Sequence, residues 1–186
     1  MPRMNSSIAG RKSLRSYLVA TLTLLAVSGT VYARQVPDVK PGPEHELLKE
    51  YAGDWEATVS AQGSESKGTT TARVALGGLW LIEDFKGDFA GTPFEGHGIT
   101  TYDAAKKKYV TVWADSMSTS PMTLEGAYDK GAKTLSMSGS MPMPDGTTMK
   151  VKQIMVSKDA DTRVMTMKDG SDMVMLEVTY KRKAKK

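Results

Sequence analysis

The sequence contains no cysteine and only two histidines among its 186 residues. The absence of cysteine excludes a disulfide framework, a thiolate nucleophile and a cysteine-ligated metal. The two histidines show no His-x-x-x-His spacing of the kind that holds zinc, and no Gly-x-Ser-x-Gly motif could carry a serine nucleophile. We therefore expect no metal and no cofactor, and the sequence identifies no catalytic residue.

The chain also lacks an apolar run long enough to span a membrane. A membrane helix needs about 20 apolar residues, whereas the uncharged run over residues 17–27 is about half that length. Basic residues precede this run, and small residues follow it up to Ala33. The pattern is typical of a secretory signal peptide. We predict a signal over residues 1–33, export to the periplasm or the extracellular space, and no transmembrane anchor after cleavage.

The formal charge of +4 is a property of the predicted signal. Cleavage removes four of the 25 basic residues and leaves 21, which equals the number of acidic residues. A nucleic-acid-binding role therefore lacks its electrostatic basis. We expect the basic tail, residues 183–186, to be a solvated terminus. The alternative is contact with anionic lipid or with another envelope protein, and the sequence identifies no protein partner.

Short segments with strand-like alternation follow one another from Trp55 to Lys181. Turns rich in Gly and Asp separate them, and none is long enough to hold a crossover helix. We predict ten antiparallel strands, over residues 55–61, 69–76, 79–89, 94–102, 109–114, 119–128, 134–141, 148–157, 162–168 and 173–181. Closing such a sheet removes both exposed edges. The sequence thus predicts an all-β, up-and-down barrel over residues 44–182, with an interior too wide for side chains to fill.

A short helix is predicted before the first strand. Residues 34–43 contain two prolines and are interpreted as a linker. Pro43 suits the first helical position and Gly53 ends the helix. An apolar side is formed by Leu47, Leu48 and Tyr51. Two turns of helix are not stable alone in water, so we expect this helix to plug one end of the barrel.

An ordered set of short motifs runs through the predicted barrel. The motifs are Gly53-Asp54-Trp55, Leu76-Gly77-Gly78, Gly87-Asp88-Phe89, Pro93-Phe94-Glu95-Gly96, Gly98, Tyr102-Asp103, Lys107-Lys108-Tyr109, Trp113, Glu125-Gly126 and Tyr128-Asp129. On these motifs the chain resembles the domain-of-unknown-function family 1579. The resemblance implies a calycin or lipocalin-like barrel and supplies no catalytic residue. Gly53, Trp55 and Arg182 are also similar to the group in which lipocalins stack an arginine over a tryptophan, which implies a structural role.

The third predicted strand carries a carboxylate among apolar side chains. Alternation places Glu83 on the same face as Leu81 and Phe85. If this face is inside, Glu83 either pairs with an Arg or Tyr across the barrel or contacts a ligand, because an unpaired buried carboxylate is costly. We predict that the interior holds a small apolar or amphipathic molecule. The expected lining is Glu83, Phe85, Tyr102, Trp113 and Met122.

The fourth and fifth predicted strands carry residues whose roles the sequence leaves open. Gly96 and Gly98 lie on the same face as Tyr102, and we expect these glycines to allow strand curvature. Trp113 could face the interior, as an apolar wall for a ligand, or the solvent.

Two other functions are kept as alternatives. Thirteen methionines include the pairs Met141/Met143, Met165/Met167 and Met173/Met175, whose thioethers suit Cu(I). The competing interpretation is that these flexible side chains fill the core. The second alternative is an enzyme that uses Glu83 with Asp115 or His97, and His97 could also be an axial haem ligand.

Overall fold

The computed structural model describes residues 39–89, 91–143 and 145–184. The predicted signal peptide and half of the predicted linker, residues 34–38, lie outside the described residues. The described residues belong to a compact unit from Asp38 to Lys186. Within it, no described helix has the length and the apolar character that crossing a bilayer requires.

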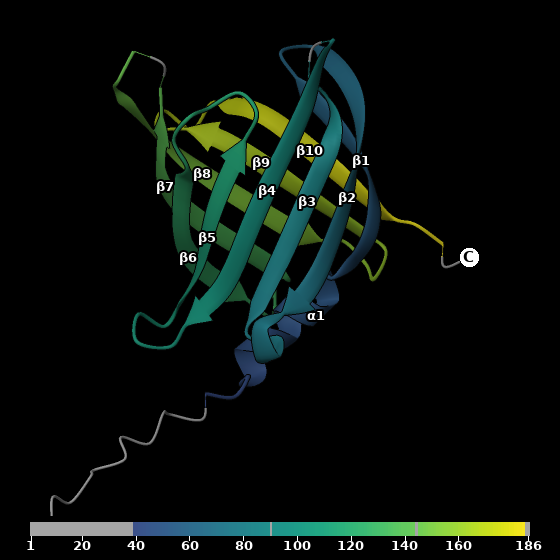
Figure 1. Cartoon of the computed structure of the whole chain (residues 1–186), viewed down its shortest axis with the longest axis vertical. Helices are drawn as coiled ribbons and strands as arrows, with labels where there is room; N and C mark the ends of the chain where they lie inside the picture. Colours follow the sequence, from purple (N-terminus) through teal and green to yellow (C-terminus); the bar gives the residue numbers. More distant parts are fainter. Residues whose placement is uncertain (1–38, 90, 144, 185–186) are drawn as a thin grey trace, which may run out of the picture. The chain divides into compact units, whose positions relative to one another are not determined.

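Ten antiparallel strands form a closed barrel, which confirms the predicted fold (Figure 1). Each strand pairs with its neighbours along the chain, and β1 pairs with β10 to close the sheet. The strands are β1 (Gly53–Ala61), β2 (Ser64–Ala75), β3 (Trp80–Phe89), β4 (Thr92–Asp103), β5 (Lys108–Asp115), β6 (Met122–Asp129), β7 (Thr134–Pro142), β8 (Thr148–Ser157), β9 (Thr162–Asp169) and β10 (Val174–Arg182).

Two strand boundaries differ clearly from the prediction. β2 begins at Ser64 instead of residue 69, because β1 and β2 are joined by a two-residue turn. Gln62 and Gly63 both have positive φ, at 50° and 79°, as a tight hairpin turn matched to the twist of its strands requires. β6 begins at Met122 instead of residue 119, directly after Pro121, which cannot donate a ladder hydrogen bond.

The plug helix consists of a 3₁₀ turn, η1 (Pro43–His45), followed by α1 (Glu46–Tyr51). The helix ends at Tyr51, and the N–H of the capping residue Ala52 donates to the Leu48 carbonyl at 3.1 Å. Gly53, predicted to end the helix, already belongs to β1. Leu47, Leu48 and Tyr51 are buried. Figure 1 shows α1 at one end of the barrel; we refer to this end as the closed end and to the opposite end as the far end.

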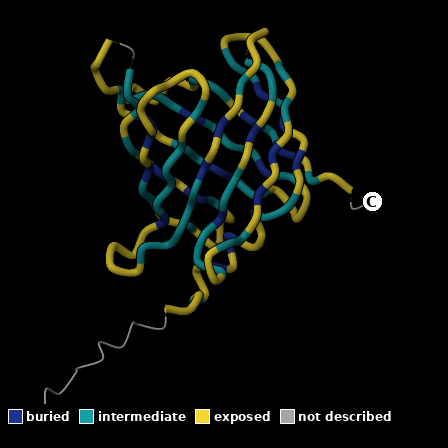
Figure 2. The backbone as a smooth tube through the Cα atoms, in the orientation of Figure 1, coloured by how far each residue is buried: buried dark blue, intermediate teal, exposed yellow. Residues whose placement is uncertain are grey.

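Buried and more exposed residues alternate along much of the barrel wall (Figure 2), as the two faces of a strand require. Many of the buried ones are aromatic or aliphatic, and Met122, Met137, Met155 and Met167 are buried with them. Flexible methionines can fill an irregular interior. Much of the barrel's interior is therefore occupied by side chains.

Candidate functional site

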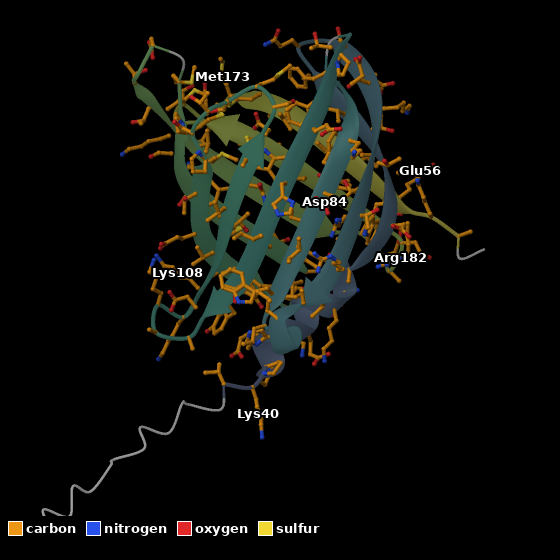
Figure 3. The ribbon with its side chains drawn as sticks, in the orientation of Figure 1. Lys40, Glu56, Asp84, Lys108, Met173 and Arg182 are labelled. Atoms are coloured by element: carbon orange, nitrogen blue, oxygen red, sulfur yellow. The ribbon has the colours of Figure 1, made fainter. Side chains whose placement is uncertain are left out.

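The face of β3 that carries Glu83 points into the barrel. Leu81 and Phe85, two residues to either side of it, are 2 % and 6 % exposed, whereas Asp84 and Lys86 are exposed to solvent. Figure 3 labels Asp84, which lies on the outer face of the barrel. Glu83 lies between Ala72 of β2 and Gly98 of β4 in the strand register, so small residues flank the carboxylate.

Glu83 pairs with an arginine from another part of the sheet. Its Oε1 lies 3.8 Å from Nη2 of Arg163 on β9. The barrel order separates β3 from β9 by β2, β1 and β10, so this ion pair reaches across the interior. Pairing with an Arg across the barrel was one of the two interpretations of Glu83, and the contact confirms it.

Arg163 is only 2 % exposed, and aromatic rings enclose it. Its Cζ lies 4.3 to 4.8 Å from the ring centres of Tyr51, Trp55 and Tyr180. Nη1 donates to the Tyr51 carbonyl at 3.3 Å. Nε and Nη2 have no hydrogen-bond acceptor among the described residues. The guanidinium is thus held in a fixed place beneath the plug helix by cation–π contacts and one hydrogen bond.

The two ends of this ion pair differ in accessibility. The Glu83 side chain keeps 20 % of its surface accessible, although it points into the barrel, while that of Arg163 keeps 2 %. Burial raises the pKa of Glu83, and the Arg163 charge partly opposes that rise. Burial also raises the pKa of Tyr180, and the nearby Glu83 adds to the effect. The accessible end of the pair is therefore its carboxylate.

Trp113 points inward and lies against β4. A Cβ placed at Gly96 would overlap the indole ring, and one at Gly98 would lie 3.1 Å from Cε3 of Trp113 and 3.7 Å from Cβ of Glu83. The indole N–H donates to Oδ2 of Asp115 at 3.0 Å. The two glycines thus provide the flat surface on which the indole rests, instead of serving strand curvature alone. Glu83 and Trp113 share the interior face around Gly98.

The Phe85 ring also lies against two glycines, one on β2 and one on β3. A Cβ at Gly68 of β2 would lie 2.5 Å from the Phe85 ring, and one at Gly87 of β3 would lie 3.1 Å from it. The Phe85 ring meets that of Phe94 edge-on at 5.7 Å. Met122 is 8 % exposed and is the register partner of Trp113. Phe85, Trp113 and Met122 therefore contribute to the interior between Glu83 and the far end.

Tyr102 lies apart from the rest of the predicted lining. It is the register partner of Tyr109, at the closed end, and the two rings are 5.2 Å apart. The His45 ring of the plug approaches it at 6.3 Å, and the Tyr109 hydroxyl donates to the Glu44 carbonyl at 2.7 Å. Tyr102 thus packs beneath the plug, because it is four residues along β4 from Gly98 toward the closed end.

Sequence reasoning missed Arg163, the most informative charged residue of the interior. A signal was present: Arg163 lies at the same alternation as Met165 and Met167 in a strand that the sequence did predict. If that face is assigned to the interior, alternation places Arg163 among apolar side chains, in the same way as it places Glu83 on the third strand.

The three residues predicted to be structural lie together at the closed end. The Arg182 guanidinium carbon is 4.0 Å from the centre of the Trp55 ring. Nη1 and Nη2 of Arg182 donate to the carbonyls of Ala52 and Glu50, at 2.7 and 2.8 Å. Gly53 has a φ of 132°, and a Cβ there would overlap Arg182. Arg182 thus ties the end of the plug helix to β10.

His97 cannot act with Glu83, so that form of the enzyme alternative is wrong. The His97 side chain is 54 % exposed on the outer face of β4, and its Nδ1 lies 2.7 Å from Oδ1 of Asp84. Alternation directs His97 away from Gly98 and Glu83, so the barrel wall lies between the two groups. Its outward orientation also removes His97 as an axial ligand for a haem inside the barrel.

The methionine pairs differ in their surroundings. Met165 and Met167 both face inward on β9, and Met155 of β8 is the register partner of Met165. Met173 is 67 % exposed and lies at the far end (Figure 3), and an irregularity between Val174 and Leu176 interrupts the pairing of β10. Within the described residues, no group of three His, Cys, Asp or Glu could hold a metal ion.

Two hollows border the described part of the barrel, and the predicted lining residue Tyr102 lines the second of them. One, of about 420 Å³, is bordered by residues of β5, β6 and β7, including Lys108 and Glu125. The other, of about 560 Å³, lies beside η1 and the closed-end halves of β3, β4 and β5. Neither coincides with the interior face around Glu83, where the expected cavity was placed.

The fold matches solved structures of other barrels. One is Rv2717c from M. tuberculosis, with a TM-score of 0.58 and 13 % identity over 77 % of this chain and 99 % of that one. Another is a designed fluorescence-activating β-barrel, with a TM-score of 0.44 and 15 % identity over 74 % of this chain and 97 % of the design. No curated protein matches the chain.

A family model described as "Protein of unknown function (DUF1579)" matches residues 40–182. This range begins in the segment before the plug helix and includes all ten strands. It confirms the resemblance drawn from the sequence motifs. The chain belongs to the DUF1579 family.

Proposed function

We propose that this protein is an exported barrel that binds a small apolar or amphipathic molecule in its interior. The observation that carries the proposal is the state of Glu83. Its side chain points into the barrel, keeps 20 % of its surface accessible, and has no hydrogen bond among the described residues. A native interior normally satisfies its polar groups, so this carboxylate faces space that water or a ligand can occupy.

The surroundings of Glu83 support an apolar partner. Toward the far end, the interior presents the rings of Phe85, Phe94 and Trp113 together with Met122 and Met167. Ligand sites in proteins combine many apolar side chains with a few polar groups that fix orientation. Methionine side chains rotate easily and adapt to varied apolar shapes, so a ligand could be accommodated by their rearrangement.

The proposal is tested by titrating the protein with Nile red, an uncharged dye whose emission rises in apolar surroundings. We expect saturable binding at one dye per protein. Met122→Gln places a polar amide of similar size inside the barrel and should weaken binding several-fold. Met117→Gln makes the same change on a residue that is 51 % exposed and should leave binding unchanged. Absence of saturable binding to the folded protein would refute the proposal.

Binding of Cu(I) by methionines is a second candidate, supported by the inward Met165 and Met167 beside Met155. Titration of Cu(I) into wild-type protein and into a Met165→Leu, Met167→Leu variant tests it. Equal affinity in the two proteins would eliminate this pair as a copper site.

A further inference from the structure

Two opposite charges, those of Glu83 and Arg163, form a pair inside the barrel. Glu83 and Arg163 approach to 3.8 Å. Among the described residues, the other charged side chain that affects the ionisation of Glu83 is Asp84, on the outer face. Because the ionised pair has no net charge, a ligand ion placed beside it would add a charge without a counter-ion. An uncompensated charge in a desolvated interior is costly.

The pair is also oriented. Three aromatic rings and a hydrogen bond hold Arg163 in place, and its guanidinium is almost fully buried. Glu83 stands in front of it with the accessible surface. A molecule that enters the interior therefore meets carboxylate oxygens first, and these oxygens accept hydrogen bonds and donate none when ionised.

No neighbouring side chain supplies a donor to this carboxylate. The indole N–H of Trp113, across Gly98, is engaged by Asp115. The nearest guanidinium nitrogen lies at 3.8 Å, beyond hydrogen-bond distance. Leu81, Phe85 and Ala72 offer no side-chain donor. In this arrangement the carboxylate keeps hydrogen-bonding capacity that water or a ligand donor can take up.

We infer that the ligand presents an uncharged hydrogen-bond donor, such as an amide N–H or a hydroxyl, to Glu83 while its apolar part extends toward Phe85, Trp113 and Met122. This inference rests on the proposed binding function and specifies the polar group that the interior selects. An uncharged donor satisfies the carboxylate and leaves the pair neutral, whereas an anion meets the carboxylate oxygens and a cation leaves the interior positively charged.

Three ligands with the same ten-carbon chain test the inference: decanamide, decan-1-amine and decanoate, each in competition with Nile red at mildly alkaline pH. We expect decanamide to bind roughly tenfold more tightly than decanoate, since one well-placed hydrogen bond contributes about 1 to 1.5 kcal/mol. Decanamide should also bind more tightly than decan-1-amine, whose ammonium donates to Glu83 but brings a charge without a counter-ion into the interior. Glu83→Gln removes the negative partner of Arg163. In that variant decanoate should become the tightest ligand, because it restores neutrality.

Asp84→Asn is the matched control, since it removes a carboxylate from the outer face one residue away, and the wild-type order should persist. Equal affinities of the three ligands for the wild-type protein, or tightest binding of either ion, would overturn the inference and leave the proposed function standing. If the three ligands bound Glu83→Gln in the same order of affinity as they bind the wild type, the inference would be overturned as well. It would also be overturned if Nile red bound but none of the three ligands competed with it. Failure of all three together with Nile red would refute the proposed function itself.

Discussion

The indole ring of Trp113 occupies the space that a side chain at Gly96 would need. This relationship explains why β4 has a glycine at this position: the indole ring on the neighbouring strand β5 fills the space that a side chain would take. Gly96→Ala should destabilise the protein by about 2 kcal/mol, since overpacking of a filled interior costs roughly 1 to 3 kcal/mol. Chemical denaturation followed by circular dichroism measures the loss.

The same substitution should cost much less in a Trp113→Leu background, because the overlapping ring is absent. Gly131→Ala is the control: a Cβ there approaches nothing closer than 3.4 Å, and the effect should stay within about 0.5 kcal/mol. If the Gly96 substitution were equally harmful with and without the indole, the overlap would not be its cause.

Arg182 should be replaceable by lysine only at a loss of stability. Lysine keeps the charge but cannot donate from two fixed nitrogens to the carbonyls of Ala52 and Glu50. We expect Arg182→Lys to lower the free energy of unfolding by about 1 to 2 kcal/mol. Lys181→Ala, at the exposed neighbouring position, should change it by less than about 0.5 kcal/mol. A neutral effect of Arg182→Lys would show that the bonds to the plug helix contribute little.

Tyr51 makes stability sensitive to alkaline pH. Burial raises the pKa of Tyr51 to about 12 from an ordinary value of 10.0, so between these values the unfolded chain loses the phenolic proton while the folded chain keeps it. Stability must therefore fall as the pH rises through this window, by up to about 3 kcal/mol for this group. Unfolding curves measured from pH 9 to 12 should show a shallower fall for Tyr51→Phe. Superimposable slopes would contradict this assignment.

Glu83 should make stability depend on pH above its ordinary pKa of 4.5. Its pKa is raised by burial above the ordinary 4.5, so the folded state holds the proton more tightly than the unfolded chain does. This contribution is fully present below about pH 4.5 and is lost as the pH rises through the folded-state pKa.

The Glu83→Gln variant has no titrating carboxyl group at this position. Its free energy of unfolding, relative to that of the wild type, should therefore rise as the pH increases from about 4.5 through the folded-state pKa of Glu83. The comparison requires denaturation curves for both proteins at several pH values, with Asp84→Asn as the control for a surface carboxylate. Parallel stability–pH curves for wild type and Glu83→Gln would contradict a raised pKa.

The sequence predicted the strand number and the barrel closure because alternation and turn residues are local signals. The start of β2 was missed because Gly68, which weakens a strand, lies inside it and is covered by the Phe85 ring. That covering depends on a neighbouring strand, which local patterns do not reveal.

The interior face of β3 could be predicted from alternation, and Glu83 was identified in this way. Its pairing with Arg163 depends on strands 80 residues apart in the chain, and only the closed barrel brings them together. Tyr102 was grouped with the lining because alternation gives the side of a strand and says nothing of the height along the barrel. Its height places it beneath the plug.

The location of the bound molecule is the most direct test of the proposed interior site. Methionine methyl groups report it, because Met122 and Met167 are buried inside the barrel while Met117 and Met173 are exposed. NMR spectra of protein labelled with ¹³C at these methyl groups should be recorded during a decanamide titration, with Met→Leu variants for assignment. The interior site predicts shifts at Met122 and Met167 with Met117 and Met173 unchanged, and shifts confined to the two exposed methionines would contradict it.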